Sequence, residues 1–347
     1  MLRQIRSAFN SPRLCYCKYA SSGSTISQTV GVGGIKLTSS GTGIGNAVMN
    51  RTFGRNAIVV ASPSSADIDG GGTVSGTIPS ASSFTLTTAA HNGGAADDGT
   101  AYAMVLGYDA RDATRGTPTN GILTSRIGGT RLEGFVFDGA TSTITVGAKN
   151  ATLTKNGTGD FTLTFRNPFG TGKTVAVASC VAARVAMVES CDAKSVRIKM
   201  YVTSSAAASD ATAVHVLVAG SDSNNNGEAT LSMPVMSSSR KPRIFGYSVT
   251  YTTQAPAYTI GTGDATLADT AVGSATFTFT TPFARAPVVV AMPVGPALNT
   301  VKFCQINSCT ATAVNVKILT AAAGAVDPDD GNGFNLIGLG WDDATEY

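Results

Sequence analysis

RLEGFVF, which begins at Arg131, returns as RIFGYSV at Arg243 and in a looser form as RLCYCKY at Arg13. Each run starts with arginine and a large aliphatic residue and then continues with aromatic residues. A recurrence with a period of about 115 residues predicts that one structural unit occurs three times.

Two further marks recur at the same spacing. Phe53, Phe169 and Phe283 each precede a short β-branched run. Each copy also closes on a glycine that lies two residues before an aspartate: Gly107-Tyr108-Asp109, Gly220-Ser221-Asp222 and Gly340-Trp341-Asp342. These marks predict a basic N-terminal arm over residues 1–12 and three repeats over residues 13–125, 126–239 and 240–347.

Alternating side chains predict that each copy is built from β-strands. FTLTF from Phe161 and VRIKMYV from Val196 change between apolar and polar at every residue, which places Arg197 and Lys199 on the solvent side. Glycine accounts for 39 of 347 residues and charged residues for only 14%, a composition that suits half-buried strands joined by tight turns. We therefore expect an all-β protein with three tandem antiparallel β-sandwich domains of the jelly-roll or immunoglobulin-like type.

Positive charge is concentrated at the N-terminal end, although the formal net charge of the whole chain is only +3. No acidic residue precedes Asp67, whereas that segment contains Arg3, Arg6, Arg13, Lys18, Lys36, Arg51 and Arg55. The first residues suit either a mitochondrial transit peptide or an anchoring arm. We favour the arm, with Arg3, Arg6, Arg13 and Lys18 as the residues that contact a partner.

Metal and nucleotide sites find little support. Asp222, Asn224 and Asn226 match the first half of a calcium-binding loop, but Met233 stands where a glutamate ligand should lie. Asp327–Asp330 is a similar acidic loop. The run Phe169–Thr174 resembles part of a phosphate-binding loop, but the first glycine is missing and a strand should follow, so we expect a hairpin turn. We expect no cofactor and no metal beyond these weak calcium candidates.

The sequence also lacks a recognisable catalytic set. A catalytic site usually occurs once in a chain, and the two histidines, His91 and His215, lie in different copies. We expect His215, in the strand Val214–Val218, to be either a hydrogen-bonded structural residue or a residue that faces the edge of a sheet. The six cysteines do not repeat with the copies and are expected to be free thiols. No apolar run is long enough to span a membrane, and no signal-peptide core is present. The protein is therefore not expected to be an enzyme or to bind a membrane.

Two stretches resemble the β-sandwich modules of tailed-bacteriophage fibres and virion decoration proteins. They are DFTLTFRNPFGTGKTVAVA from Asp160 and ATFTFTTPFARAPVVVAMP from Ala275, each a strand, a Pro-Phe turn and a Val-rich strand. The first copy departs from this pattern, because Phe53 has no preceding proline. The resemblance implies a structural role in a virion, often as a trimer, without an active site.

We therefore expect a capsid decoration or fibre component of a tailed phage, located in the virion and docked through its N-terminal arm and first copy. The expected partners are major capsid or tail proteins and further copies of the chain, as a homo-oligomer or trimer, but not nucleic acid. The alternative is a glycan-binding adhesin or receptor-binding module that recognises a host glycan. Exposed aromatic residues beside Asp or Asn would favour that alternative, but aromatic residues make up only 7% of the chain.

Overall fold

The computed structural model describes most of the chain between Arg13 and Trp341. The described residues are 13–22, 25–32, 35–49, 53–64, 72–76, 83–90, 100–109, 124–127, 130–170, 174–180, 184–202, 207–221, 242–252, 255–260, 265–271, 273–294, 302–320, 324–325 and 333–341. They form strands and turns, with no helix among them. The predicted all-β class with antiparallel sheets is confirmed.

The strands fall into three successive groups, which we call the first, second and third modules. The first module contains β1 (Arg13–Ser22), β2 (Thr25–Val32), β3 (Ile35–Gly41), β4 (Ile44–Met49), β5 (Phe53–Ser64), β6 (Gly72–Gly76), β7 (Ser83–Ala90) and β8 (Thr100–Asp109). The second contains β9 (Thr124–Ile127), β10 (Thr130–Asp138), β11 (Thr143–Val146), β12 (Ala151–Gly157), β13 (Asp160–Phe165), β14 (Thr174–Cys180), β15 (Arg184–Cys191), β16 (Ser195–Val202) and β17 (Val214–Ser221). The third contains β18 (Pro242–Thr252), β19 (Ala255–Ile260), β20 (Ala265–Ala271), β21 (Ser274–Phe279), β22 (Val288–Val294), β23 (Lys302–Cys309), β24 (Ala313–Thr320), β25 (Gly324–Ala325) and β26 (Gly333–Trp341).

Strand order is the same in all three modules. One sheet runs β2-β1-β8-β5 in the first module, β11-β10-β17-β14 in the second and β19-β18-β26-β22 in the third. The other sheet runs β3-β4-β7-β6, then β12-β13-β16-β15, then β20-β21-β24-β23. We call these the inner and outer sheets, because the inner sheets face the centre of the molecule. Short strands β9 and β25 add to this plan beside β10 and β24.

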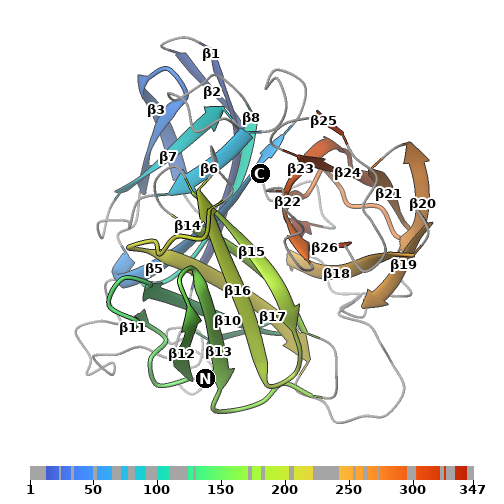
Figure 1. Ribbon diagram of the computed structural model, residues 1–347. Helices are drawn as coiled ribbons and strands as arrows, with labels where there is room; N and C mark the ends of the chain where they lie inside the picture. The colour runs from blue at the N-terminus through green and yellow to red at the C-terminus, as the bar shows by residue number, and fades with distance from the viewer. Residues whose placement is uncertain are drawn as a thin grey trace, which may run out of the picture.

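The three modules surround one central axis. The last strands of the inner sheets, β5, β14 and β22, contact one another there. Each of them also lies beside an outer-sheet strand of another module: β5 beside β23, β22 beside β15, and β14 beside β6. The first two contacts are parallel pairings, at Ser64 with Ile306 and at Val294 with Val188. Figure 1 shows the modules as three lobes, blue to cyan, green to yellow, and orange to red.

This arrangement explains why the strands differ in sequence pattern. The central strand β14 (TVAVASC) is buried along its whole length, because one face lies in its own module and the other faces the axis. Outer-sheet strand β13 (DFTLTF) has one solvent-facing side, and its burial therefore alternates. As predicted, Arg197 and Lys199 lie on the exposed side of β16, where they alternate with buried neighbours. Two sheets continue across module borders, so the predicted domain limits stay a prediction.

The recurring arginine and glycine face each other in the inner sheets. Arg131 of β10 pairs with Gly220 of β17, and the same pairing joins Arg13 to Gly107 and Arg243 to Gly340. In the first module, by contrast, the recurring phenylalanine, Phe53, is the first residue of β5 and pairs with Asp109.

A phenylalanine ring packs directly on the glycine of this pair. The Phe169 ring lies under the Arg131 guanidinium, whose carbon is 3.7 Å from the ring centroid. The Arg131 Nη2 also donates a hydrogen bond of 2.8 Å to the Asn167 carbonyl oxygen. A Cβ at Gly220 would lie 2.3 Å from Phe169 Cδ1. Glycine is therefore required by close packing at this position, and the turn connects an outer-sheet strand to an inner-sheet strand instead of forming the predicted hairpin.

We expect Gly220→Ala to destabilise the protein by about 1–3 kcal/mol, because the Phe169 ring would have to move out of its packed position. The matched control is Gly157→Ala, since a Cβ there meets nothing within 4 Å, and we expect that change to stay within about 0.5 kcal/mol. Urea unfolding of both variants measures the difference. Equal destabilisation of the two variants would contradict the packing argument.

Candidate functional site

Side chains at the central axis join each module to another one. Ser62 of β5 donates a 2.9 Å hydrogen bond to the Ala291 carbonyl oxygen of β22 and accepts a 3.0 Å bond from the Ala291 N–H. Ser179 of β14 donates a 2.8 Å bond to the Val59 carbonyl oxygen of β5. These serines are equivalent, because Ser62 pairs with Tyr102 and Ser179 pairs with His215 in the neighbouring strand of each inner sheet. The buried hydroxyl groups therefore hold the modules together at equivalent points.

A second set of contacts comes from the strands next to the central ones. His215 of β17 accepts a 3.2 Å hydrogen bond at Nδ1 from the Val59 N–H of the first module. Asn335 of β26, at the equivalent register, donates a 2.9 Å bond from Nδ2 to the Ala176 carbonyl oxygen of the second module. Both side chains are buried, with about 1% exposed. His215 therefore lies at the centre of a sheet and in a module junction, not at an edge.

A small cavity lies among the central strands. Its volume is about 40 Å³, which is enough for a water molecule but not for a sugar ring or a larger ligand. Burial raises the pKa of the Cys180 thiol to about 12 and that of Cys304 well above its ordinary value, so both thiols are protonated at neutral pH. Such thiols are poor nucleophiles. The lining residues are Ala61, Ser62, Ala178, Ser179, Cys180, Arg184, Val185, Ala186, Ala291, Met292, Pro293, Phe303 and Cys304.

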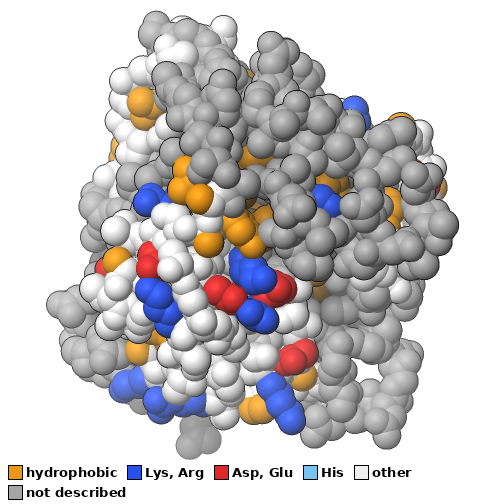
Figure 2. Space-filling view, viewed as in Figure 1, with side chains coloured by type: hydrophobic (Ala, Val, Ile, Leu, Met, Phe, Trp, Pro, Cys, Tyr) orange, Lys and Arg blue, Asp and Glu red, His pale blue; other side chains and the backbone are white. Residues whose placement is uncertain are grey.

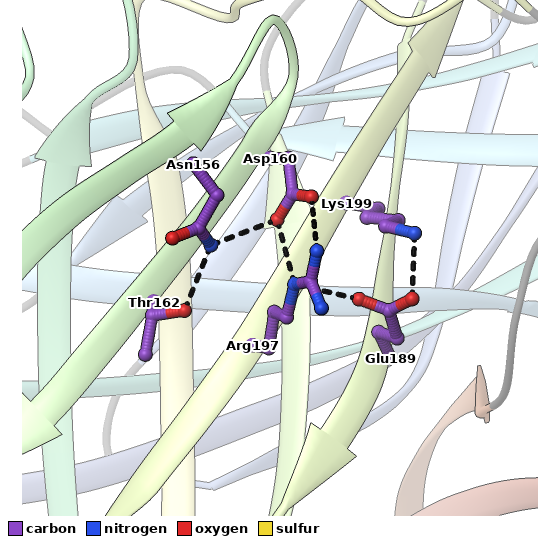
Figure 3. A network of polar contacts seen from close by, with 6 residues as sticks. All are labelled: Asn156, Asp160, Thr162, Glu189, Arg197 and Lys199. Carbon is purple, nitrogen blue, oxygen red and sulfur yellow. Dashed lines mark hydrogen bonds and ion pairs between the residues drawn. The ribbon is translucent and has the colours of Figure 1, made fainter.

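The outer sheet of the second module carries a network of charged residues (Figure 3). Arg197 Nε and Nη2 bind the two carboxylate oxygens of Asp160 at 2.9 and 2.6 Å. Arg197 Nε also lies 2.7 Å from Glu189 Oε2, and Glu189 binds the Lys199 ammonium through its other oxygen. Asn156 Nδ2 donates to Asp160 Oδ1 at 3.1 Å. The hydrogen bond from Arg197 is the main reason that the pKa of Asp160 is lowered.

At the position of Arg197, the other two modules place uncharged side chains. In the third module, Asn315 takes the place of Arg197 and donates from Nδ2 to Ser274 and Thr276 at 2.9 and 2.8 Å. In the first, Thr85 takes that place and donates a 2.9 Å bond to Asn46. A polar contact is thus common to the three outer sheets, and its charged form belongs to the second. Figure 2 shows acidic and basic side chains interspersed on the viewed face.

The predicted anchor residues fall partly within the described chain. Arg3 and Arg6 lie outside the described residues. Arg13 begins β1, in the inner sheet of the first module. Lys18 lies in the same strand, half-buried, with its ammonium 5.0 Å from the centroid of the Tyr102 ring. The two described residues therefore belong to a packed strand, and their role in contacting a partner stays a prediction.

The calcium candidates Asp222, Asn224 and Asn226 lie outside the described residues, as does the acidic loop Asp327–Asp330. Within the described ranges, no group of three or more His, Cys, Asp or Glu residues is placed to hold a metal ion. The same part of the chain holds no helix with the length and apolar character needed to cross a membrane. Cys180, Cys191, Cys304 and Cys309 are free thiols.

No family model matches this chain, and neither a curated protein nor a solved structure matches it. Sequence reasoning did not identify the polar residues of the central axis. A signal for them is nevertheless present, because Ser62 and Ser179 each end an otherwise apolar run that follows a recurring phenylalanine.

We expect Arg197→Met to raise the pKa of Asp160 towards its ordinary value, because the largest cause of its depression would be removed. A depressed carboxylate pKa stabilises the fold above about pH 4, and this contribution is lost as pH falls through the folded-state pKa. The loss of stability at neutral pH should be below about 1 kcal/mol, since the Arg197 side chain is 40% exposed.

Carboxyl-carbon NMR titration measures the Asp160 pKa in both proteins. The control is Lys149→Met, which removes an exposed cation from the same module. An unchanged Asp160 titration in Arg197→Met would contradict the conclusion that Arg197 lowers the Asp160 pKa.

Proposed function

We propose that this protein is a structural component of a tailed-phage virion, a capsid decoration or fibre protein without catalytic activity. The observation that carries the proposal is the packing of β5, β14 and β22 around one axis, with the same strand order in each module. Three modules held in this way present three outer sheets that share one strand order. Such an arrangement suits a part that docks on an assembled surface and projects into solvent.

The sequence resemblance supports the same proposal from a different direction. The Pro-Phe turn of the resembling stretches contains Phe169 and Phe283, which pack on Gly220 and Gly340 in their inner sheets. The stretch that resembles virion modules therefore lies where the two sheets of a module are joined. The resemblance thus concerns the connection between the outer and inner sheets of a module, and not a surface loop.

The proposed attachment is through the basic arm, residues 1–12, together with the first module. Arg3 and Arg6 give the arm positive charge without a nearby acidic residue in sequence. Opposite charge on the partner would speed docking and make it sensitive to salt. A major capsid or tail protein with an acidic docking surface is the partner that this arm fits.

We also propose a homo-oligomer, as the resemblance implies, but a trimer is not needed to produce threefold packing. One chain already places three modules around an axis. Sedimentation equilibrium of the full chain tests this part of the proposal, because a monomeric mass at micromolar concentration would remove the oligomer and leave the docking proposal in place.

We expect removal of residues 1–12 to lower binding to virus particles prepared without this protein by at least about tenfold at physiological salt. The deletion ends before Arg13, because β1 lies between β2 and β8 and a longer deletion would disrupt the inner sheet. Co-sedimentation of the purified protein with the particles measures occupancy, and thermal unfolding checks that the truncated protein is folded.

The matched control pair consists of Arg3→Gln with Arg6→Gln, and Lys149→Gln with Lys194→Gln on the exposed surface of the second module. Only the arm variant should lose binding. Full occupancy by the truncated protein would overturn the proposed arm, and failure of the full chain to bind any such particle would overturn the virion role.

A further inference from the structure

His215 is the one described histidine, and it is buried in the junction between the first and second modules. Its Nδ1 accepts the Val59 N–H, so Nδ1 carries no proton and the neutral ring carries its proton on Nε2. Nε2 is buried and has no hydrogen-bond partner among the described residues. A proton added to Nδ1 would remove the acceptor and place a positive charge in the junction.

No charged residue of the two neighbouring strands lies directly opposite His215. The titratable residues on the two strands that pair with β17 are Arg131, Glu133 and Asp138 on β10 and Cys180 on β14. The His215 side chain shares a face with Val136 and Ser179, which lie opposite it, and strand alternation puts Arg131, Glu133 and Cys180 on the other face. Alternation puts Asp138 on the His215 face, but Asp138 ends β10, and its Oδ1 accepts the backbone N–H groups of Ala140 and Thr141. Across the junction, the described side chains of β5, Ile58–Ser62, are all uncharged.

The equivalent positions in the other modules hold side chains other than histidine. Asn335 occupies this position in the third module and binds the Ala176 carbonyl oxygen. Tyr102 occupies it in the first module, in register with Ser62 of β5. The three modules therefore have different side chains at this position, and histidine, in the second module, is the one whose ordinary pKa lies near neutral pH.

We propose that His215 makes the junction between the first and second modules acid-sensitive: protonation of Nδ1 breaks the Val59 hydrogen bond and opens this junction, while the junction made by Asn335 stays closed. The proposal is independent of the proposed function. Burial lowers the pKa of His215 to about 4 in the closed structure. In an open junction, the ring would have its ordinary pKa of about 6.5.

The sign of the effect follows from these two values. Because the open form binds the proton more tightly than the closed form, closure is strongest above about pH 6.5 and weakens as pH falls towards 4. Between pH 7.5 and 4.5 the equilibrium constant for opening should rise on the order of 50-fold.

Hydrogen–deuterium exchange of the full-length wild-type protein tests the proposal without any substitution. After correction for intrinsic exchange rates, we expect peptides from β5 and β17 to lose protection at pH 4.5 relative to pH 7.5, while peptides from β18 and β26 keep theirs. Equal loss of protection in all these strands would indicate global unfolding and would overturn the proposal, as would unchanged protection throughout.

The variant that tests the residue itself is His215→Asn, which copies Asn335 and keeps an acceptor for the Val59 N–H. We expect it to abolish the acid-dependent loss of protection in β5 and β17. The matched control is His91→Asn, which removes the other histidine of the chain and should leave the wild-type pH profile unchanged. A wild-type pH profile in His215→Asn would show that another group is responsible.

Discussion

The structure depends on the burial of three central strands on both of their faces. β5, β14 and β22 each face their own module on one side and the axis on the other, so a polar group placed there has no access to water. Such a group is costly unless it is hydrogen-bonded. Ser62 and Ser179 meet this requirement by binding the backbone of another module's central strand. The same contacts that satisfy these polar groups therefore fix how the modules are arranged.

The outer sheets are under no such constraint, and they differ in chemistry. The position held by Arg197 in the second module holds Asn315 in the third and Thr85 in the first, and each of these makes a polar contact within its own sheet. Exposed ion pairs contribute little to stability. The charged surface of the second module can therefore change without loss of the fold, which suits a protein whose modules share a core but present different faces.

Much of the local structure could be predicted from sequence. Period-two alternation in FTLTF and VRIKMYV predicted strands with the correct exposed side. The Val-rich runs were predicted as strands, and only the structure shows that β14 is buried along its whole length. The recurring glycines were predicted only as the closing mark of each copy, and the structure adds that Gly220 is packed against the Phe169 ring. The connections between strands were predicted less well. The Pro-Phe turn was expected to form a hairpin, but it joins the outer sheet to the inner sheet of its module. Its Phe169 ring packs beneath the Arg131 guanidinium of the inner sheet, a contact that the sequence pattern does not indicate.

What the sequence alone determined is the all-β class, the faces of the strands and the recurrence of the arginine and glycine marks. Only the tertiary structure decided that the modules surround an axis and that His215 meets Val59, 156 positions away in the chain. The physical reason is that alternation specifies which side of a strand is apolar but not which surface covers it. That choice is made by the packing of whole sheets, in which a single residue contributes only when its partner from a distant module is already in place.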